Sequence, residues 1–167
     1  MRRAGALVGV VFVIILVLFV ANRDVRRDEN PGDPVITVDF PATAEPGSIQ
    51  AATFTISNPG PGDMGSLFLA FVRVGPSQGG SELPFPIVDP GRDKVNPNIV
   101  SIEPEPEAIS PDAVQFRFGS LEQGEQLTVT FELRIPEVTG EVANSVTAYA
   151  GEDPSRASGV RLSTQVI

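Results

Sequence analysis

The sequence contains no cysteine, no histidine and no tryptophan, and Lys94 is its only lysine. Without cysteine and histidine the chain cannot form disulfides, thiol or imidazole catalytic pairs, or the usual zinc and haem ligand sets. A serine or threonine nucleophile would need a base, and Lys94, in a predicted loop, is the one side chain that could serve. The composition therefore predicts a protein that is not an enzyme.

Basic side chains are scarce as well, because 12 Lys and Arg stand against 21 Asp and Glu, and the formal net charge at pH 7 is −9. This charge argues against nucleic acid as a partner. Glycine and proline number 16 each, yet the mean hydropathy is +0.09. A turn-rich, acidic chain with positive mean hydropathy is expected to concentrate its apolar residues in one segment.

That segment lies at the N-terminus. Residues 4–21 are 18 residues without a polar side chain, and as a helix they would be about 27 Å long, enough to cross the hydrocarbon core of a bilayer. Arginines stand on both sides. We expect residues 1–21 to form a retained transmembrane signal anchor. The alternative is a cleaved signal peptide, but a cut after Ala21 would place the bulky Phe19 where a small residue is needed.

The charges that flank this segment are nearly balanced, so they decide its orientation only weakly. Gly5 and Gly9 form a small-xxx-small pair through which the helix could pack against another helix. The alternative is that small residues are simply frequent in membrane helices.

Residues 22–34 are charged and turn-rich, which predicts a juxtamembrane linker, and residues 35–167 form the predicted folded domain. In that domain apolar and polar residues alternate in short runs separated by Gly, Pro, Asn and Asp. About eight strands result, which predicts an all-β, immunoglobulin-like two-sheet sandwich of about 7–9 strands. The uninterrupted apolar run at 67–72 predicts a central strand, or one covered on both faces. The predicted strands span 35–40, 49–57, 67–74, 99–103, 114–118, 125–135, 142–150 and 160–166.

A long segment, residues 75–98, interrupts this rhythm, and loops of such length are often functional. Leu83, Phe85, Ile87 and Val88 lie among prolines there, which block ladder hydrogen bonds and predict an edge segment or an extended stretch. These four residues are candidates for contact with a partner. The alternative is that they fold back and cap one end of the sandwich.

Three stretches carry a family resemblance: TISNPGPGDMGSLFLAF at 55–71, FGSLEQGEQLTVTFELRIP at 118–136 and GEVANSVTAYAGEDPSRAS at 140–158. They resemble the bacterial immunoglobulin-like domains of cell-surface and S-layer proteins, close to the cell-adhesion-related domain found in bacteria. The resemblance implies an immunoglobulin-like fold and a role at the cell surface. By analogy with this domain type, we expect a bacterial inner-membrane protein whose C-terminal domain is periplasmic or extracellular.

Within these stretches, Asn58 and Asp153 are expected to hydrogen-bond to nearby backbone, and Asn144 is expected to do the same from a strand. Three glycines are expected to supply turn conformations: Gly60, Gly62 and Gly124.

Acidic residues alternate with prolines at Glu103, Glu105 and Glu107. This pattern predicts an extended acidic strip rather than a converging pair of catalytic carboxylates. The simplest interpretation is a solvated loop that also discourages edge pairing.

No cofactor is expected, with calcium as the one weak possibility, because sandwich domains can bind Ca²⁺ through loop oxygens. The candidate ligands are Asp89, Asp93 and Asn96 in one loop and Glu152 and Asp153 in another. Neither loop has the spacing of a recognised calcium loop.

Two functions remain open. The first is a non-enzymatic single-pass membrane protein that serves as a structural or scaffolding accessory subunit of a larger membrane complex, such as a photosynthetic or respiratory one. Its partners would be other integral membrane subunits. The second is a cell-surface adhesion or envelope-binding module. Neither function requires a small-molecule substrate.

Overall fold

The short runs of alternating residues fold into ten β-strands in the computed structural model, which describes residues 32–72, 98–110, 115–151 and 154–167. A short 3₁₀ helix, η2 (Pro154–Arg156), precedes the last strand. The strands are β1 (Val35–Asp39), β2 (Thr43–Ala44), β3 (Ile49–Ser57), β4 (Leu67–Val72), β5 (Ile99–Glu103), β6 (Ala108–Ile109), β7 (Gln115–Phe118), β8 (Gln126–Arg134), β9 (Gly140–Ala150) and β10 (Ser158–Val166).

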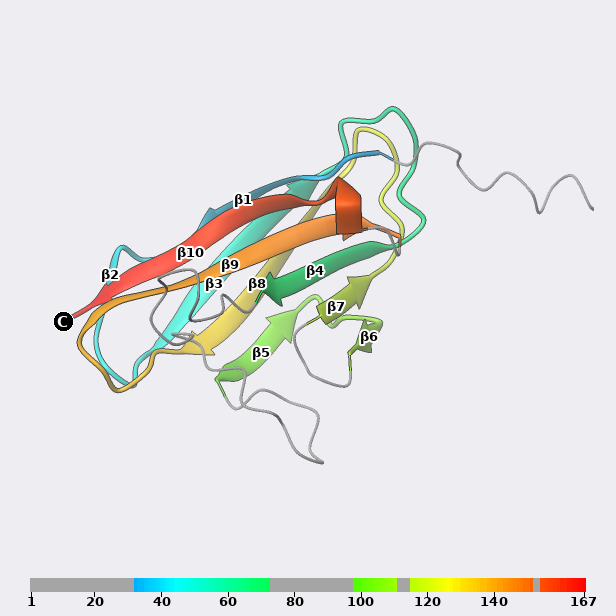
Figure 1. Cartoon of the computed structure of the whole chain (residues 1–167). Helices are drawn as coiled ribbons and strands as arrows, with labels where there is room; N and C mark the ends of the chain where they lie inside the picture. The colour runs from blue at the N-terminus through cyan, green and yellow to red at the C-terminus, as the bar shows by residue number, and fades with distance from the viewer. Residues whose placement is uncertain (1–31, 73–97, 111–114, 152–153) are drawn as a thin grey trace, which may run out of the picture. The chain divides into compact units, whose positions relative to one another are not determined.

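These strands form two sheets that pack face to face (Figure 1). One sheet has four strands in the order β1-β3-β8-β5, and the other has six in the order β2-β10-β9-β4-β7-β6. Neighbouring strands are antiparallel, apart from the short parallel pair of β2 and β10. The edge strand β1 lies against β10, so the two sheets approach each other along that side.

The core fills the space between the sheets with the inward residues of each strand. Its centre is a group of four phenylalanines, Phe54, Phe71, Phe116 and Phe131, whose ring centroids lie 5.1 to 6.1 Å apart in edge-to-face contacts. Each of these rings is at most 5% exposed. Such edge-to-face pairs add stability beyond the burial of apolar area.

The all-β two-sheet prediction is confirmed, and each predicted strand is present with described ends that agree within two residues. The expected number of strands was too low, because the structure adds β2 and β6. Each of these lies at an edge of the six-stranded sheet and is two residues long. Two residues are too few to show an alternation of apolar and polar side chains. The apolar run at 67–72 is a central strand as predicted, since β4 lies between β9 and β7.

The chain divides into two units, Met1–Asn30 and Pro31–Ile167. In the part of the chain that the structure describes, no helix has the length and apolar character needed to span a membrane. The predicted anchor at residues 1–21, with Gly5 and Gly9, lies outside the described residues. The anchor therefore stays a prediction.

The strands run between two ends of the sandwich, which we call the N-terminal pole and the C-terminal pole. The N-terminal pole holds Gly32, where the described chain begins, and the connections that follow β3, β5, β7 and β9. The C-terminal pole holds the β8–β9 turn and Ile167, whose N–H donates to the Ala44 carbonyl. Figure 1 shows the N-terminal pole at the right and the C-terminal pole at the left.

Candidate functional site

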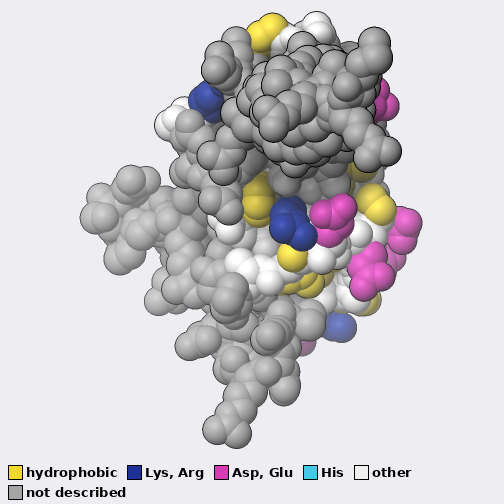
Figure 2. Space-filling view, turned by 90° about the vertical axis from the view of Figure 1, so that its right-hand side faces the viewer, with side chains coloured by type: hydrophobic (Ala, Val, Ile, Leu, Met, Phe, Trp, Pro, Cys, Tyr) yellow, Lys and Arg dark blue, Asp and Glu magenta, His cyan; other side chains and the backbone are white. Residues whose placement is uncertain are grey.

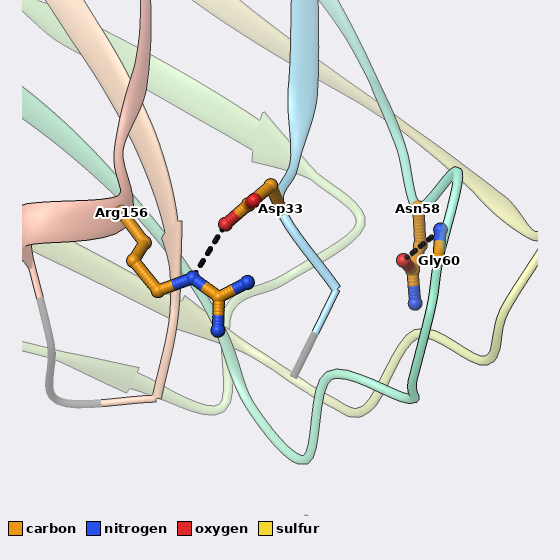
Figure 3. Close-up of polar contacts among 4 residues, drawn as sticks. All are labelled: Asp33, Asn58, Gly60 and Arg156. Atoms are coloured by element: carbon orange, nitrogen blue, oxygen red, sulfur yellow. Dashed lines mark hydrogen bonds and ion pairs between the residues drawn. The ribbon is translucent and has the colours of Figure 1, made fainter. Parts of the chain in front are cut away.

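Asn58 ties together two connections of the N-terminal pole. Its side chain is fully buried, and Figure 3 shows its hydrogen bond with Gly60. Its Nδ2 donates to the carbonyl oxygens of Gly62 at 3.0 Å and of Leu121 at 2.9 Å, and its Oδ1 accepts from the Gly60 N–H at 3.0 Å. The backbone N–H and C=O of Asn58 pair with the β7–β8 connection as well. Every polar group of this buried residue is therefore used, which fixes the β3–β4 connection on the β7–β8 connection.

Glycines make this tie possible where a side chain would not fit. Gly60 has φ +101° and Gly124 has φ +85°, a conformation that other residues rarely adopt. A Cβ atom on Gly32 would lie 1.9 Å from the Asn58 Oδ1, so only glycine can pass there. The turn role predicted for Gly60 and Gly124, and the backbone hydrogen bonding predicted for Asn58, are confirmed.

The start of the described chain is held at this pole by two contacts. The Gly32 N–H donates to the Gly62 carbonyl at 3.1 Å. The Nε atom of Arg156 in η2 lies 2.6 Å from the Asp33 Oδ1, as Figure 3 shows. The hydrogen bond from Arg156 holds the pKa of the Asp33 carboxyl below its usual value, against a smaller opposing effect of desolvation. Both side chains reach solvent, so this ion pair positions the chain more than it stabilises the fold.

A pocket of about 250 Å³ shares Leu121 with this tie, and we call it the crossover pocket. It lies where residues 104–107 cross from β5 in the four-stranded sheet to β6 in the six-stranded sheet. Its walls come from both sheets. The lining residues are Leu67, Pro104, Glu105, Glu107, Phe118, Gly119, Ser120, Leu121 and Leu127.

The floor of the crossover pocket is apolar, and its rim carries two carboxylates. Glu107 is held by its backbone, whose N–H donates to the Arg117 carbonyl at 2.8 Å, and its Oε2 lies 3.5 Å from the Arg117 Nε. Glu105 makes no ion pair with another residue that the structure describes. The site can therefore offer an unneutralised carboxylate beside apolar surface.

An aromatic pair lies on the outer face of the six-stranded sheet. The Phe68 and Tyr149 rings stack with their centroids 5.2 Å apart and their planes 8° from parallel. Gln115 donates a hydrogen bond to the Tyr149 hydroxyl. Burial raises the pKa of Tyr149, and the hydrogen bond from Gln115 partly opposes this effect. The phenol therefore stays neutral at physiological pH, in keeping with a packing role.

Two polar side chains are buried in the sandwich without hydrogen bonds. Asn144 and Thr164 are each 2% exposed, and neither the Asn144 amide nor the Thr164 hydroxyl has a partner among the described residues. They lie diagonally on the inner faces of β9 and β10, because Asn144 pairs with Leu162 and Thr164 pairs with Val142. The expectation that Asn144 bonds to nearby backbone is wrong, because its side chain points between the sheets, where the neighbouring backbone is committed to the ladders.

Within the described ranges, no group of three or more acidic residues converges on a space that could hold a metal ion. The other candidate residues lie outside those ranges, so the predictions made for them stay predictions. These residues are Leu83, Phe85, Ile87 and Val88, the loop lysine Lys94, and the calcium candidates Asp89, Asp93, Asn96, Glu152 and Asp153.

No protein-family model and no curated protein matches the chain. Solved structures do. The CARDB (cell-adhesion related) domain of a Pyrococcus furiosus protein, crystallised with two metal ions, is 12% identical, with 83% of this chain and 90% of that chain covered and a TM-score of 0.48. A PapD-like domain of human CEP192 is 16% identical, with 85% and 91% covered and a TM-score of 0.42. The bacterial hydrophobin BslA is 10% identical, with 79% and 99% covered and a TM-score of 0.42.

The fold is an all-β sandwich of two sheets with ten strands. The structural neighbours include the cell-adhesion-related domain that three stretches of the sequence resemble. At these identities and scores the likeness concerns the fold alone.

The crossover pocket is the feature of this two-sheet sandwich that sequence reasoning missed. The sequence predicts a solvated acidic strip at Glu103, Glu105 and Glu107, and these three side chains are exposed. The strip nevertheless bridges the two sheets above buried Leu121 and Phe118. One signal was present, because prolines on both sides of Glu105 between two predicted strands are typical of a rigid connection.

Proposed function

We propose that the chain is a non-enzymatic binding module that works in cell-surface adhesion or envelope binding. One observation carries this proposal. The three stretches that resemble the cell-adhesion-related domain meet at the N-terminal pole, where Asn58 of the first bonds to Leu121 of the second, and Gly151 of the third donates to the Ser66 carbonyl of the first. The resemblance therefore falls on residues that build one structural unit, which supports a common domain type.

The chemistry of the described residues favours binding over catalysis. The pKa of the Asp33 carboxyl is lowered by its hydrogen bond with Arg156, and the pKa of the Tyr149 phenol is raised by burial. Strongly perturbed groups that face a cleft are typical of active sites. Asp33 is paired at the start of the chain and Tyr149 packs on a ring, so neither has that setting.

The apolar segment at the N-terminus completes the proposal. We infer that residues 1–21 anchor the chain in the inner membrane and that the sandwich works outside the cytoplasm. The sequence also suggested an accessory subunit of a membrane complex. No observation on the described residues favours that role over adhesion, so adhesion is the function we propose.

Adhesion can be tested with beads. The full chain is coupled to beads through a C-terminal tag, and the beads are incubated with intact cells and with isolated envelope fragments of the source organism. We expect saturable binding to one of these surfaces. Beads that carry the chain with Phe131→Asp, which disrupts the core, are the control and should not bind.

A second measurement separates the two roles. The tagged chain is extracted from its native membrane in mild detergent and its native mass is recorded. A monomer or self-oligomer together with bead binding supports adhesion. Co-purification with one membrane complex in fixed stoichiometry, without bead binding, would replace adhesion by the subunit role.

A further inference from the structure

We propose that the crossover pocket binds the side chain of an arginine presented by a partner protein. This inference rests on the proposed function, because it names the chemistry of the partner that the binding module takes.

The floor of the pocket consists of apolar side chains that are almost fully buried. Leu67, Phe118 and Leu121 are between 0 and 5% exposed, so their packed side chains form a fixed apolar surface. Leu127 of β8 completes the wall from the opposite sheet. A ligand group that lies on this floor must itself be apolar, because a polar group would lose its hydrogen bonds to water there.

The rim of the pocket carries Glu105. It stands between Pro104 and Pro106, whose rings fix φ at both neighbouring positions, so the backbone that presents its exposed side chain at the pocket is restrained. Glu107, the other acidic residue of the rim, is already partly neutralised by Arg117 at 3.5 Å. Glu105 is thus the carboxylate that remains to recognise a ligand.

Together the floor and the rim select for an apolar stem with a positive head. An arginine side chain has this form, because its methylene groups can lie on Phe118 and Leu121 while its guanidinium reaches the Glu105 carboxylate. The guanidinium can bind a carboxylate through two parallel hydrogen bonds, which a lysine ammonium cannot do. A purely apolar ligand would remove water from the Glu105 carboxylate without supplying a positive charge to pair with it. An anionic ligand would be repelled by this carboxylate.

The size of the pocket agrees with one side chain. Its volume of about 250 Å³ lies below the range of about 300–1,000 Å³ that is typical of pockets for drug-sized ligands. A protein partner that presents a single anchor residue fits this volume, and the rest of the partner would rest on the surrounding surface.

The net charge of the domain favours a cationic partner as well. Residues 34–167 contain 7 Lys and Arg against 17 Asp and Glu, a net charge of −10. On the N-terminal pole, which faces the reader in Figure 2, acidic side chains gather beside hydrophobic ones. Such a surface attracts basic segments and speeds their encounter, more strongly at low salt.

The test uses the full chain, labelled with ¹⁵N in detergent micelles, and a capped Gly-Arg-Gly peptide as the probe. The control probe is the same peptide with citrulline, which keeps the shape of arginine without its charge. We expect the arginine peptide to shift the amide signals of Gly119 and Ser120, which line the pocket. We expect the citrulline peptide to leave these signals in place.

Two matched variants decide whether Glu105 is responsible. Glu105→Gln should weaken binding of the arginine peptide roughly threefold, the size of one partly exposed ion pair. Glu122→Gln removes the same charge from the same pole but not from the pocket lining, and should have a clearly smaller effect. Equal binding of the citrulline peptide, or equal weakening by the two variants, would overturn the proposal.

The bead assay separates this inference from the function on which it rests. If beads that carry Glu105→Gln adhere as well as wild-type beads, the pocket is not the partner site, while adhesion stands. If wild-type beads do not adhere although the arginine peptide shifts Gly119 and Ser120, the adhesion role fails and the chemistry of the pocket stands.

Discussion

Replacing Asn58 by alanine would remove three hydrogen bonds from a fully buried position. The carbonyl oxygens of Gly62 and Leu121 each keep a second donor, the N–H groups of Gly32 and Met64. Only the Gly60 N–H loses the partner described for it. At about 1 kcal/mol for each bond, the expected loss in the free energy of unfolding is about 3 kcal/mol. For a domain of this size the melting temperature should fall by about 12 °C.

Urea unfolding followed by circular dichroism measures this loss, with an unchanged m-value as the sign that the unfolded state is the same. Asn144→Ala is the matched control, because it removes the same amide from an equally buried site where that amide has no hydrogen bond. We expect Asn144→Ala to cost well under half as much. Equal losses in the two variants would show that the hydrogen bonds of Asn58 contribute nothing beyond packing, and the reasoning would be refuted.

Three further predictions concern the core, a buried hydroxyl and pH. Phe131→Asp places a charge among the four packed phenylalanines and should abolish cooperative unfolding, whereas a folded, soluble variant would show that the register of β8 is wrong. Thr164→Val removes a buried hydroxyl that has no hydrogen-bond partner among the described residues, and it should raise the free energy of unfolding by about 1 kcal/mol in the same urea assay. A lower free energy of unfolding would show that the hydroxyl does form a hydrogen bond. The pKa of Asp33, followed by NMR, should lie below its ordinary value of 3.8 and rise toward it in Arg156→Gln. Because the folded pKa is the lower one, the stabilisation from this pair is present above the unfolded pKa and is lost as pH falls through the folded pKa, so an unchanged titration in Arg156→Gln would refute the pairing.

Strands such as β3 and β8 could be predicted because one face of each is buried, so that apolar and polar residues alternate along the sequence. β3 was predicted residue for residue, since Ala52, Phe54 and Ile56 face the core and threonines alternate with them. β2 and β6 could not be predicted, because a two-residue strand is defined by its partner strand and has no period of its own.

The candidate site was less accessible to sequence reasoning. The residue type and turn context of Asn58 predicted hydrogen bonds to backbone, but its partner Leu121 lies 63 residues away in the sequence. Asn144 gave the wrong expectation because residue type alone does not show which way a side chain faces. The crossover pocket exists only once Leu67 and Leu127, from different sheets, are brought together.

The positions of Gly32 and Ile167 at opposite poles have a mechanical consequence. A pull on Gly32 away from the C-terminal pole runs along the axis of β1, while the hydrogen bonds between β1 and β3 lie across that axis. Five residue pairs join the two strands, from Val35 with Ser57 to Asp39 with Thr53. Tension along β1 loads the hydrogen bonds of these pairs in shear, so that they bear the force together instead of breaking one after another. The Asp33–Arg156 pair and the Gly32–Gly62 hydrogen bond take up the force first. If the domain is tethered through Gly32, the hydrogen bonds along the whole length of β1 therefore resist its unfolding under tension.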